Sequence, residues 1–247
     1  MKKVRTRLDA LMALRGLTAS RQKAQALIMA GKVLVDGEVV DKAGKDVSLE
    51  SIITLKEGNP FVSRAGVKLA GFLDSLSIDV AGITAVDVGA STGGFTDCLL
   101  KRGAKKVYAI DVGKGLIDVS LRNDPRVVMM EECNIRHLDP NDIGEPADLA
   151  VVDVSFISLE KVLERIAMLV KDGGHLIALI KPQFEVGKGQ VGKGGIVKDP
   201  LLHKEVVGRI KDFALSIGLV PLAVDESTLK GTKGNLEFLI YLEVRRQ

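Results

Sequence analysis

The sequence contains no tryptophan, and only 4% of its residues are aromatic. It has two cysteines, Cys98 and Cys133, and three widely spaced histidines, His137, His175 and His203. Two cysteines make no disulfide framework, and the lack of a Cys-x-x-Cys or His-x-x-x-His pair argues against a metal centre. So few aromatic side chains leave little material for platforms that stack nucleic-acid bases. We therefore expect no metal site and no extended aromatic platform.

Long hydrophobic runs are also missing from the sequence. A membrane-spanning helix needs about 20 consecutive apolar residues, and no stretch approaches that length. The basic residues near the N-terminus precede no secretory hydrophobic region. We expect a cytoplasmic protein without stable membrane insertion. The chain has 247 residues, 46% of them hydrophobic, which is enough for a large and a small domain with buried cores.

Positive charge gathers at the N-terminal end. Residues 1–60 hold 11 Lys or Arg and 7 Asp or Glu, a net charge of +4, whereas the remaining 187 residues hold 24 and 25, a net charge of −1. Within residues 1–35 there are 8 basic side chains and one acidic side chain, Asp9. A basic end on a near-neutral body predicts an acidic partner for that end. On charge alone, a solvated basic surface is an equally good interpretation.

The N-terminal pattern predicts a small α+β domain. Residues 5–15 and 21–30 have the apolar spacing of two helices, and residues 33–40 predict a hairpin turning at Asp36-Gly37. Over about residues 5–52 this order resembles the small RNA-binding fold of ribosomal small-subunit protein four. The resemblance implies binding of structured RNA, with basic side chains on its phosphates. The implied contacts are Arg5, Arg7, Arg21, Lys23 and Lys32.

The rest of the chain predicts an α/β domain. Residues 54–60, with Gly-Asn-Pro, have the composition of a linker, so we place the domains at 1–58 and 59–247. Beyond a helix at 65–76, strands at 84–88, 106–110, 127–130, 149–153 and 176–180 alternate with helices at 94–101, 159–169 and 201–217. This alternation predicts a parallel sheet covered on both faces. Residues 220–225 and 237–244 predict a closing antiparallel hairpin, giving a seven-stranded, mostly parallel, Rossmann-like sheet.

The first of these strands runs into Asp87-Val-Gly-Ala-Ser-Thr-Gly-Gly-Phe95, and a helix begins at once. Small residues let a backbone approach a ligand closely, and a helix start offers free N–H groups. About twenty residues later Asp111 ends the next strand, where a carboxylate suits a ribose diol. We predict that this region holds the nucleoside end of a cofactor. A tight strand–helix turn without a ligand is the alternative.

The glycine spacing departs from the Gly-x-Gly-x-x-Gly of dinucleotide-binding proteins. It resembles instead the first motif of S-adenosylmethionine-dependent class I methyltransferases. That resemblance implies S-adenosylmethionine as the cofactor, bound by the loop and by the ends of neighbouring strands. The implied contacts are Asp87, Gly89, Ala90, Ser91, Thr92, Gly93, Gly94, Phe95, Asp111, Cys133, Asn134 and Asp153.

Residues 181–199 form a long irregular stretch rich in glycine and lysine, which we expect to be a mobile loop on the substrate side. Its Gly187-x₄-Gly192-Lys193 approaches the pattern of a triphosphate-binding loop. Gly194, however, stands where Ser or Thr should hold Mg²⁺, and no helix is predicted to begin there. The pattern is therefore poor evidence for a nucleoside triphosphate site.

Asp153 and Lys181 each end an apolar strand, at the edge where open α/β sheets bind ligands. Together with segments 63–69, 87–95, 153–158, 181–185 and 234–238, they make the chain resemble the TlyA family, within the wider FtsJ group. TlyA proteins are ribosomal RNA 2′-O-methyltransferases, historically labelled haemolysins. The resemblance implies methylation of a ribose 2′-hydroxyl, of a cytidine, in ribosomal RNA or a ribosomal subunit. The implied site comprises Lys68, Asp153, Lys181 and Glu237, with Arg64 on the RNA.

These residue types suit the chemistry, because a ribose hydroxyl must be oriented and relieved of its proton. A lysine withdrawn from water can accept that proton. We assign this role to Lys181, with Asp153 orienting it and with Lys68 and Glu237 positioning the ribose. Methylation of a base is the nearest competitor, but no Pro-Pro-aromatic follows Asp153 and neither cysteine is well placed. A membrane-active haemolysin and a non-catalytic RNA-binding assembly factor are the further alternatives.

Overall fold

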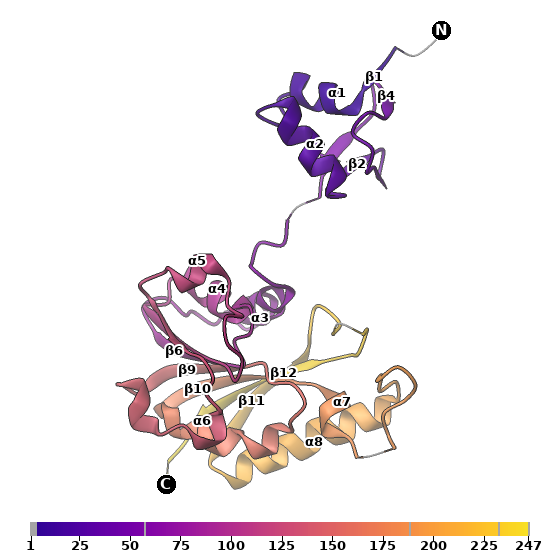
Figure 1. Cartoon of the computed structure of the whole chain (residues 1–247). Helices are drawn as coiled ribbons and strands as arrows, with labels where there is room; N and C mark the ends of the chain where they lie inside the picture. Colours follow the sequence, from indigo (N-terminus) through magenta and orange to yellow (C-terminus); the bar gives the residue numbers. More distant parts are fainter. Residues whose placement is uncertain (1–3, 57, 188, 232, 247) are drawn as a thin grey trace. The chain divides into compact units, whose positions relative to one another are not determined.

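A computed structural model of the chain describes residues 4–56, 58–187, 189–231 and 233–246. The chain divides into two units, residues 1–60 and residues 61–247, and Figure 1 labels many of their helices and strands. The sequence predicts this division two residues earlier. Residues 1–3 and 57 of the predicted RNA-binding domain, and residue 188 of the irregular stretch, lie outside the described residues.

The N-terminal unit is built on two helices, α1 (Leu8–Leu14) and α2 (Arg21–Met29). Five short strands accompany them: β1 (Arg5–Arg7), β2 (Val33–Val35), β3 (Glu38–Val39), β4 (Asp46–Ser48) and β5 (Ile53–Leu55). β1 pairs with β4, and β2 pairs with β3 and β5, all antiparallel. Helices and strands share one buried core: Leu8, Leu11, Met12, Ala24, Ile28, Val33, Val35, Val40, Val47 and Ile53.

Two predictions for this unit are wrong at their edges. Residues 5–7 form β1 rather than the first turn of a helix, because their backbone pairs with β4. Residues 54 and 55, predicted as the start of the linker, belong instead to β5, because they pair with β2. The hairpin is confirmed by the pairing of β2 with β3. Its turn residues have φ angles of 51° at Asp36 and 87° at Gly37, as an Asp-Gly turn requires.

Asp9 is fully buried in the first turn of α1, and its carboxylate accepts hydrogen bonds from several side chains. Arg7 donates two hydrogen bonds to it at 3.1 and 2.9 Å, Arg21 donates one at 3.0 Å and Gln25 one at 2.7 Å. The hydrogen bonds from Arg7, and then those from Gln25 and Arg21, hold the pKa of Asp9 well below its usual range although burial opposes them. Two arginines predicted to bind RNA therefore also anchor the fold.

The C-terminal unit contains a seven-stranded sheet in the order β11-β12-β10-β9-β6-β7-β8. The strands are β6 (Thr84–Val88), β7 (Lys106–Ile110), β8 (Val127–Met130), β9 (Ala147–Val152), β10 (Val170–Ile180), β11 (Leu219–Glu226) and β12 (Phe238–Val244). Neighbours from β10 to β8 run parallel, whereas β12 is antiparallel to β10 and β11. The predicted seven-stranded, mostly parallel α/β sheet with its closing hairpin is confirmed.

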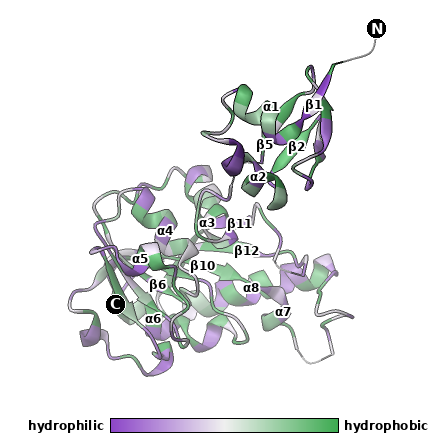
Figure 2. Ribbon diagram, turned by 45° about the horizontal axis from the view of Figure 1, so that its top comes forward, coloured by the Kyte–Doolittle hydropathy of each residue, from purple (hydrophilic) through white to green (hydrophobic). Residues whose placement is uncertain are grey.

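Helices cover both faces of this sheet (Figure 1). On one face α3 (Arg64–Ser75), α4 (Gly94–Lys101) and α5 (Val119–Arg122) share a core through side chains such as Leu69, Phe95 and Leu121. On the other, α6 (Leu163–Leu169) and α8 (Pro200–Ser216) pack through Ile166 and Ile210. The strands between them are apolar (Figure 2), as expected when parallel strands are buried on both sides.

Several predicted boundaries shift in this unit. β10 begins at Val170, earlier than predicted, and the helix expected at 159–169 is divided into the 3₁₀ turn η3 (Leu159–Lys161) and α6. Within the predicted irregular stretch, α7 (Pro182–Glu185) forms one turn, with proline at the helix start where its missing N–H is tolerated. The 3₁₀ turns η1 (Ile135–His137) and η2 (Pro140–Ile143) complete the unit.

The strand order reverses beside β6, because the chain continues to β7 and β8 on one side and to β9 on the other. A crevice at the carboxyl ends of the strands is expected at such a reversal. Among the described helices, none is both long and apolar enough to cross a membrane. Nor do the described residues include a cluster of three or more His, Cys, Asp or Glu suited to a metal ion.

Candidate active site

The segment from Gly89 to Gly93 joins β6 to α4, and both glycines have left-handed backbones, with φ angles of 83° and 91°. A Cβ atom at Gly89 would lie 2.7 Å from the carbonyl oxygen of Asp153, and one at Gly93 would lie 2.3 Å from the Cδ1 atom of Leu121. The sequence predicts that these glycines make room for a ligand. Backbone conformation and the packing of neighbouring segments require glycine here as well.

Asp111, directly after β7, fastens this loop. Its carboxylate accepts hydrogen bonds from the N–H groups of Ser91, at 2.8 Å, and Gly113, at 2.7 Å. The same residue lines a cavity of about 470 Å³ with Cys133 and Asn134. The walls of this first cavity are mostly apolar, which suits a flat ring next to a diol. The structure thus brings Asp111, Cys133 and Asn134 to the loop, as the nucleoside prediction requires.

Asp87 on β6 is completely buried. One carboxylate oxygen accepts hydrogen bonds from the N–H and the hydroxyl of Thr96, at 2.9 and 2.6 Å, while Oδ1 has no partner among the described residues. Burial raises the pKa of Asp87 to about 7, against the opposing effect of the Thr96 hydrogen bonds. Asp87 lines a second cavity, of about 350 Å³, which adjoins the first at Gly89 and Asp153.

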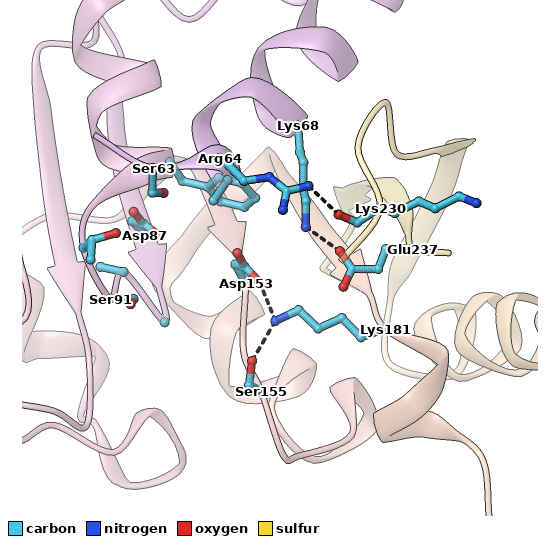
Figure 3. A pocket seen from close by; sticks show the side chains of 15 residues that line it. Ser63, Arg64, Lys68, Asp87, Ser91, Asp153, Ser155, Lys181, Lys230 and Glu237 are labelled. Carbon is cyan, nitrogen blue, oxygen red and sulfur yellow. Dashed lines mark hydrogen bonds and ion pairs between the residues drawn. The ribbon is translucent and has the colours of Figure 1, made fainter. Parts of the chain in front are cut away.

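Two ion pairs line the second cavity (Figure 3). Nζ of Lys68, from α3, lies 2.5 Å from Oε2 of Glu237, just before β12. Nζ of Lys181, after β10, lies 2.6 Å from Oδ1 of Asp153, after β9, and donates to the Ser155 hydroxyl at 2.8 Å. Lys68 and Glu237 are buried, whereas Asp153 and Lys181 are half-buried. All four predicted catalytic residues therefore face one space.

The topology explains why these four residues meet. Asp153 and Lys181 follow neighbouring parallel strands, whose carboxyl ends share an edge of the sheet. Glu237 precedes β12, which runs antiparallel to β10 and therefore begins at that same edge. Lys68 comes from α3, which Leu69 and the rest of its apolar side pack against the sheet. The fold, rather than local sequence, assembles the site.

Three more residues border the second cavity at the start of α3 and in the segment before β12. The Arg64 guanidinium donates a hydrogen bond to the carbonyl oxygen of Lys230 at 3.0 Å. Arg64, predicted as an RNA contact, is exposed and lines the cavity with Ser63 and Lys230 (Figure 3). Sequence patterns did not single out Ser63 or Lys230, because neither ends a strand or lies in the glycine loop.

Two further residues that the sequence reasoning missed organise the segment after β9. Ser155 accepts the hydrogen bond from Lys181. Glu185 is buried, and its carboxylate accepts hydrogen bonds from the Ser158 hydroxyl at 2.7 Å and the Leu159 N–H at 2.8 Å. Burial raises the pKa of this Glu185 carboxyl. Ser155 lies in the motif 153–158 and Glu185 lies in the motif 181–185. Their closeness in sequence to Asp153 and Lys181 was the signal that could have identified them.

An aromatic pair stands next to Lys181. Phe156 is 89% exposed, has a left-handed backbone with φ of 64°, and its ring centroid lies 4.9 Å from that of Phe184. The Lys181 Nζ atom lies 5.8 Å from the centroid of the Phe184 ring. A left-handed phenylalanine is strained and needs support from its surroundings. Because the sequence has few aromatic residues, it gave no reason to expect an aromatic pair at this place.

The predicted RNA contacts of the N-terminal unit differ in their surroundings. Arg7 and Arg21 hold the buried carboxylate of Asp9, and their side chains remain 49% and 51% exposed. Arg5 donates a hydrogen bond to a backbone carbonyl of β4 at 2.8 Å. Lys23 and Lys32 are both exposed. Each of the three arginines therefore has a contact within the unit besides any contact with RNA.

Residues 61–244 match the FtsJ-like methyltransferase family, and residues 6–53 match the S4 domain. The 16S/23S rRNA (cytidine-2′-O)-methyltransferase TlyA of Mycobacterium tuberculosis is 46% identical over 98% of this chain and 91% of its own length. Hemolysin A of Brachyspira hyodysenteriae is 39% identical over 95% of this chain and 98% of its own. A solved structure from Streptococcus thermophilus, also named as a hemolysin, has a TM-score of 0.76 at 40% identity, covering 98% of this chain and 90% of that one.

We expect Asp87 to make the stability of the ligand-free protein depend on pH. Its pKa of about 7 in the folded chain lies above the ordinary 3.8, so folding favours the protonated carboxyl. The resulting stabilisation is complete below pH 4 and is lost as the pH rises through 7. The free energy of unfolding of wild type minus that of Asp87→Asn should therefore fall by about 2–4 kcal/mol between pH 4 and pH 8.

Chemical denaturation at a series of pH values measures this difference. Asn keeps an acceptor for the two Thr96 hydrogen bonds, so the substitution changes mainly the ionisable group. Asp212→Asn, at an exposed position of α8, is the matched control. Parallel pH curves for wild type and Asp87→Asn would contradict the expectation.

Proposed function

Because the chain belongs to the TlyA family of FtsJ-like methyltransferases, we propose that it transfers a methyl group from S-adenosylmethionine to the 2′-hydroxyl of a cytidine in ribosomal RNA. The observation that carries this proposal is the meeting of Lys68, Asp153, Lys181 and Glu237 around one cavity. A ribose hydroxyl needs such groups because it reacts poorly until its proton is removed. A ribosomal substrate would place the protein in the cytoplasm.

The two adjoining cavities fit S-adenosylmethionine, which supplies a methyl group activated by a sulfonium. The unpaired Oδ1 of Asp87 offers an acceptor to the ammonium group of the methionine end. Gly89 leaves the backbone open at the junction of the cavities. Asp111 would bind the ribose hydroxyls, and Cys133 and Asn134 would border the adenine. The donors and acceptors present therefore match the cofactor that the family implies.

We propose that the Nζ atom of Lys181 accepts the proton of the 2′-hydroxyl. Asp153 and Ser155 fix this atom, from distances of 2.6 and 2.8 Å. The more deeply buried pair of Lys68 and Glu237 would bind the ribose and hold its hydroxyl in line with the methyl group. In a transfer of this kind, positioning of the two reactants supplies much of the rate.

The cysteines argue against methylation of a pyrimidine carbon, because that reaction needs a thiolate nucleophile. Cys98 lies in the buried core of α4, and burial raises the pKa of its thiol to about 11. Burial also raises the pKa of Cys133, which lines the first cavity and not the one around Lys181. Neither a membrane-lytic activity nor RNA binding alone requires the two lysine–carboxylate pairs.

The S4 domain, in this proposal, supplies affinity and register on the RNA, while the methyltransferase unit supplies the chemistry. Basic side chains that meet phosphates release counterions, which makes binding depend on salt. Arg7 and Arg21 keep about half of their surface exposed while they hold Asp9, so both can also meet a phosphate. Lys23 and Lys32 complete this basic set without contacting Asp9.

Lys181→Ala should slow methyl transfer by ~10²–10⁴-fold, because it removes the proton acceptor. Lys181→Arg should be nearly as slow, since a guanidinium stays protonated. Binding of S-adenosylmethionine should change little in either variant. Single-turnover transfer to ribosomal RNA at saturating enzyme measures the rate, with Lys161→Ala, exposed on η3, as the control. A near wild-type rate for Lys181→Arg would reduce Lys181 to a positioning charge.

Replacing Lys23 and Lys32 by Gln should flatten the salt dependence of RNA binding while sparing the Asp9 cluster. For each lysine that meets a phosphate, its replacement should lower the slope of log K against log salt by about 0.7–0.9. Titration of a ribosomal RNA fragment at several salt concentrations measures the slope. The same charge change at Lys204 and Lys211, exposed on α8, is the control. An unchanged slope for the Lys23 and Lys32 variant would show that these lysines do not contact the RNA phosphates.

A further inference from the structure

A third cavity, of about 360 Å³, has no role in the chemistry described so far. It shares Ser155, Lys181 and Glu237 with the second cavity, so it opens onto the same lysine. Asp87 and Asp111, which we assign to the cofactor, line only the other two cavities. The remaining wall is formed by Phe156, Gln183, Phe184, Val191, Gly195, Lys233 and Asn235.

Gln183, on α7, is the unusual polar member of this wall. Its Oε1 atom is shielded from solvent and accepts no hydrogen bond from the residues that the structure describes. Such an unsatisfied buried acceptor is rare and calls for an explanation. The neighbouring amide of Asn235 is already engaged, accepting from the Val197 N–H at 3.0 Å and donating to the Gly195 carbonyl at 2.8 Å. Gln183 therefore retains an acceptor for an incoming group.

The covalent structure of a nucleotide connects this cavity to the reacting hydroxyl. The base and the 2′-hydroxyl are carried by adjacent carbons of the ribose, so a base must lie close to wherever Lys181 meets the hydroxyl. The third cavity offers space at that lysine, and the Phe156–Phe184 pair gives it an aromatic wall suited to a flat ring. The second cavity, with Asp87 and Arg64 in its wall, suits charged groups instead.

We propose that the third cavity takes the target nucleobase and that Gln183 reads its exocyclic amine, favouring cytosine over uracil. This inference rests on the proposed 2′-O-methylation. Cytosine presents an N4 amine where uracil presents a carbonyl oxygen. The amine donates to Oε1 of Gln183, whereas a uracil oxygen that faces Oε1 meets a second acceptor and is paired only if the amide rotates to present its NH2 group. Gln183 is thus a specificity-determining residue with no part in proton transfer.

The test begins with the nucleotide that the wild-type protein methylates in ribosomal RNA. Single-turnover rates are then compared for RNAs with cytidine, uridine or the pyrimidin-2-one ribonucleoside, which lacks the amine, at that position. Wild type should prefer cytidine to both. Gln183→Met, of similar length but without the acceptor, should slow transfer to cytidine about tenfold and leave the pyrimidin-2-one RNA unaffected. Gln183→Glu keeps an acceptor and should keep the preference.

Asn123→Ala, an exposed amide at the end of α5, is the control and should change none of these rates. Equal slowing of all RNAs by Gln183→Met, or an undiminished preference for cytidine, would overturn the role of Gln183. The pyrimidin-2-one RNA tests wild type itself, so equal rates with cytidine overturn the inference even if Gln183→Met does not fold. A wild-type protein that leaves every ribose unmethylated would instead refute the proposed function, and this inference with it.

Discussion

The pairing of charges at one edge of a sheet is the constraint on which the C-terminal unit depends. Two lysines and two carboxylates are drawn out of bulk water there, and buried charges are costly unless each meets an opposite charge. Lys68 and Glu237 lie 169 residues apart in the chain, so their pair forms only when β12 has closed the sheet against β10. Lys181 and Asp153 pair across neighbouring strands. The completed fold and the proposed chemistry therefore rest on the same contacts.

Part of this site could be predicted because strand ends are visible in a sequence. An apolar run that ends in a charged residue places Asp153 and Lys181 at one edge once the sheet is known to be parallel. Pairing over long distances leaves no such local signal. Residues 5–7 are a strand only because β4 lies beside them, and the arginines around Asp9 gather only in the folded unit. The burial that raises the pKa of Asp87 likewise exists only in the folded unit.

The segment after β9 connects the three cavities, because Ser155 lines each of them. Glu185 holds this segment through Ser158 and Leu159, and Phe156 keeps a strained backbone within it. When a site is already rigid before its ligands bind, less free energy is lost on ordering its residues during binding. We therefore see the segment as the support that lets a cofactor, a ribose and a base meet at Lys181.

The chemical identity of the methylated nucleoside tests the central claim most directly. Ribosomal subunits that lack the modification would be incubated with the protein and S-adenosylmethionine carrying an isotopically labelled methyl group. The RNA would then be digested to nucleosides and analysed by mass spectrometry. We expect the label in 2′-O-methylcytidine, and far less of it with Lys181→Ala. Label found on a base, with the ribose unmodified, would contradict the proposed function.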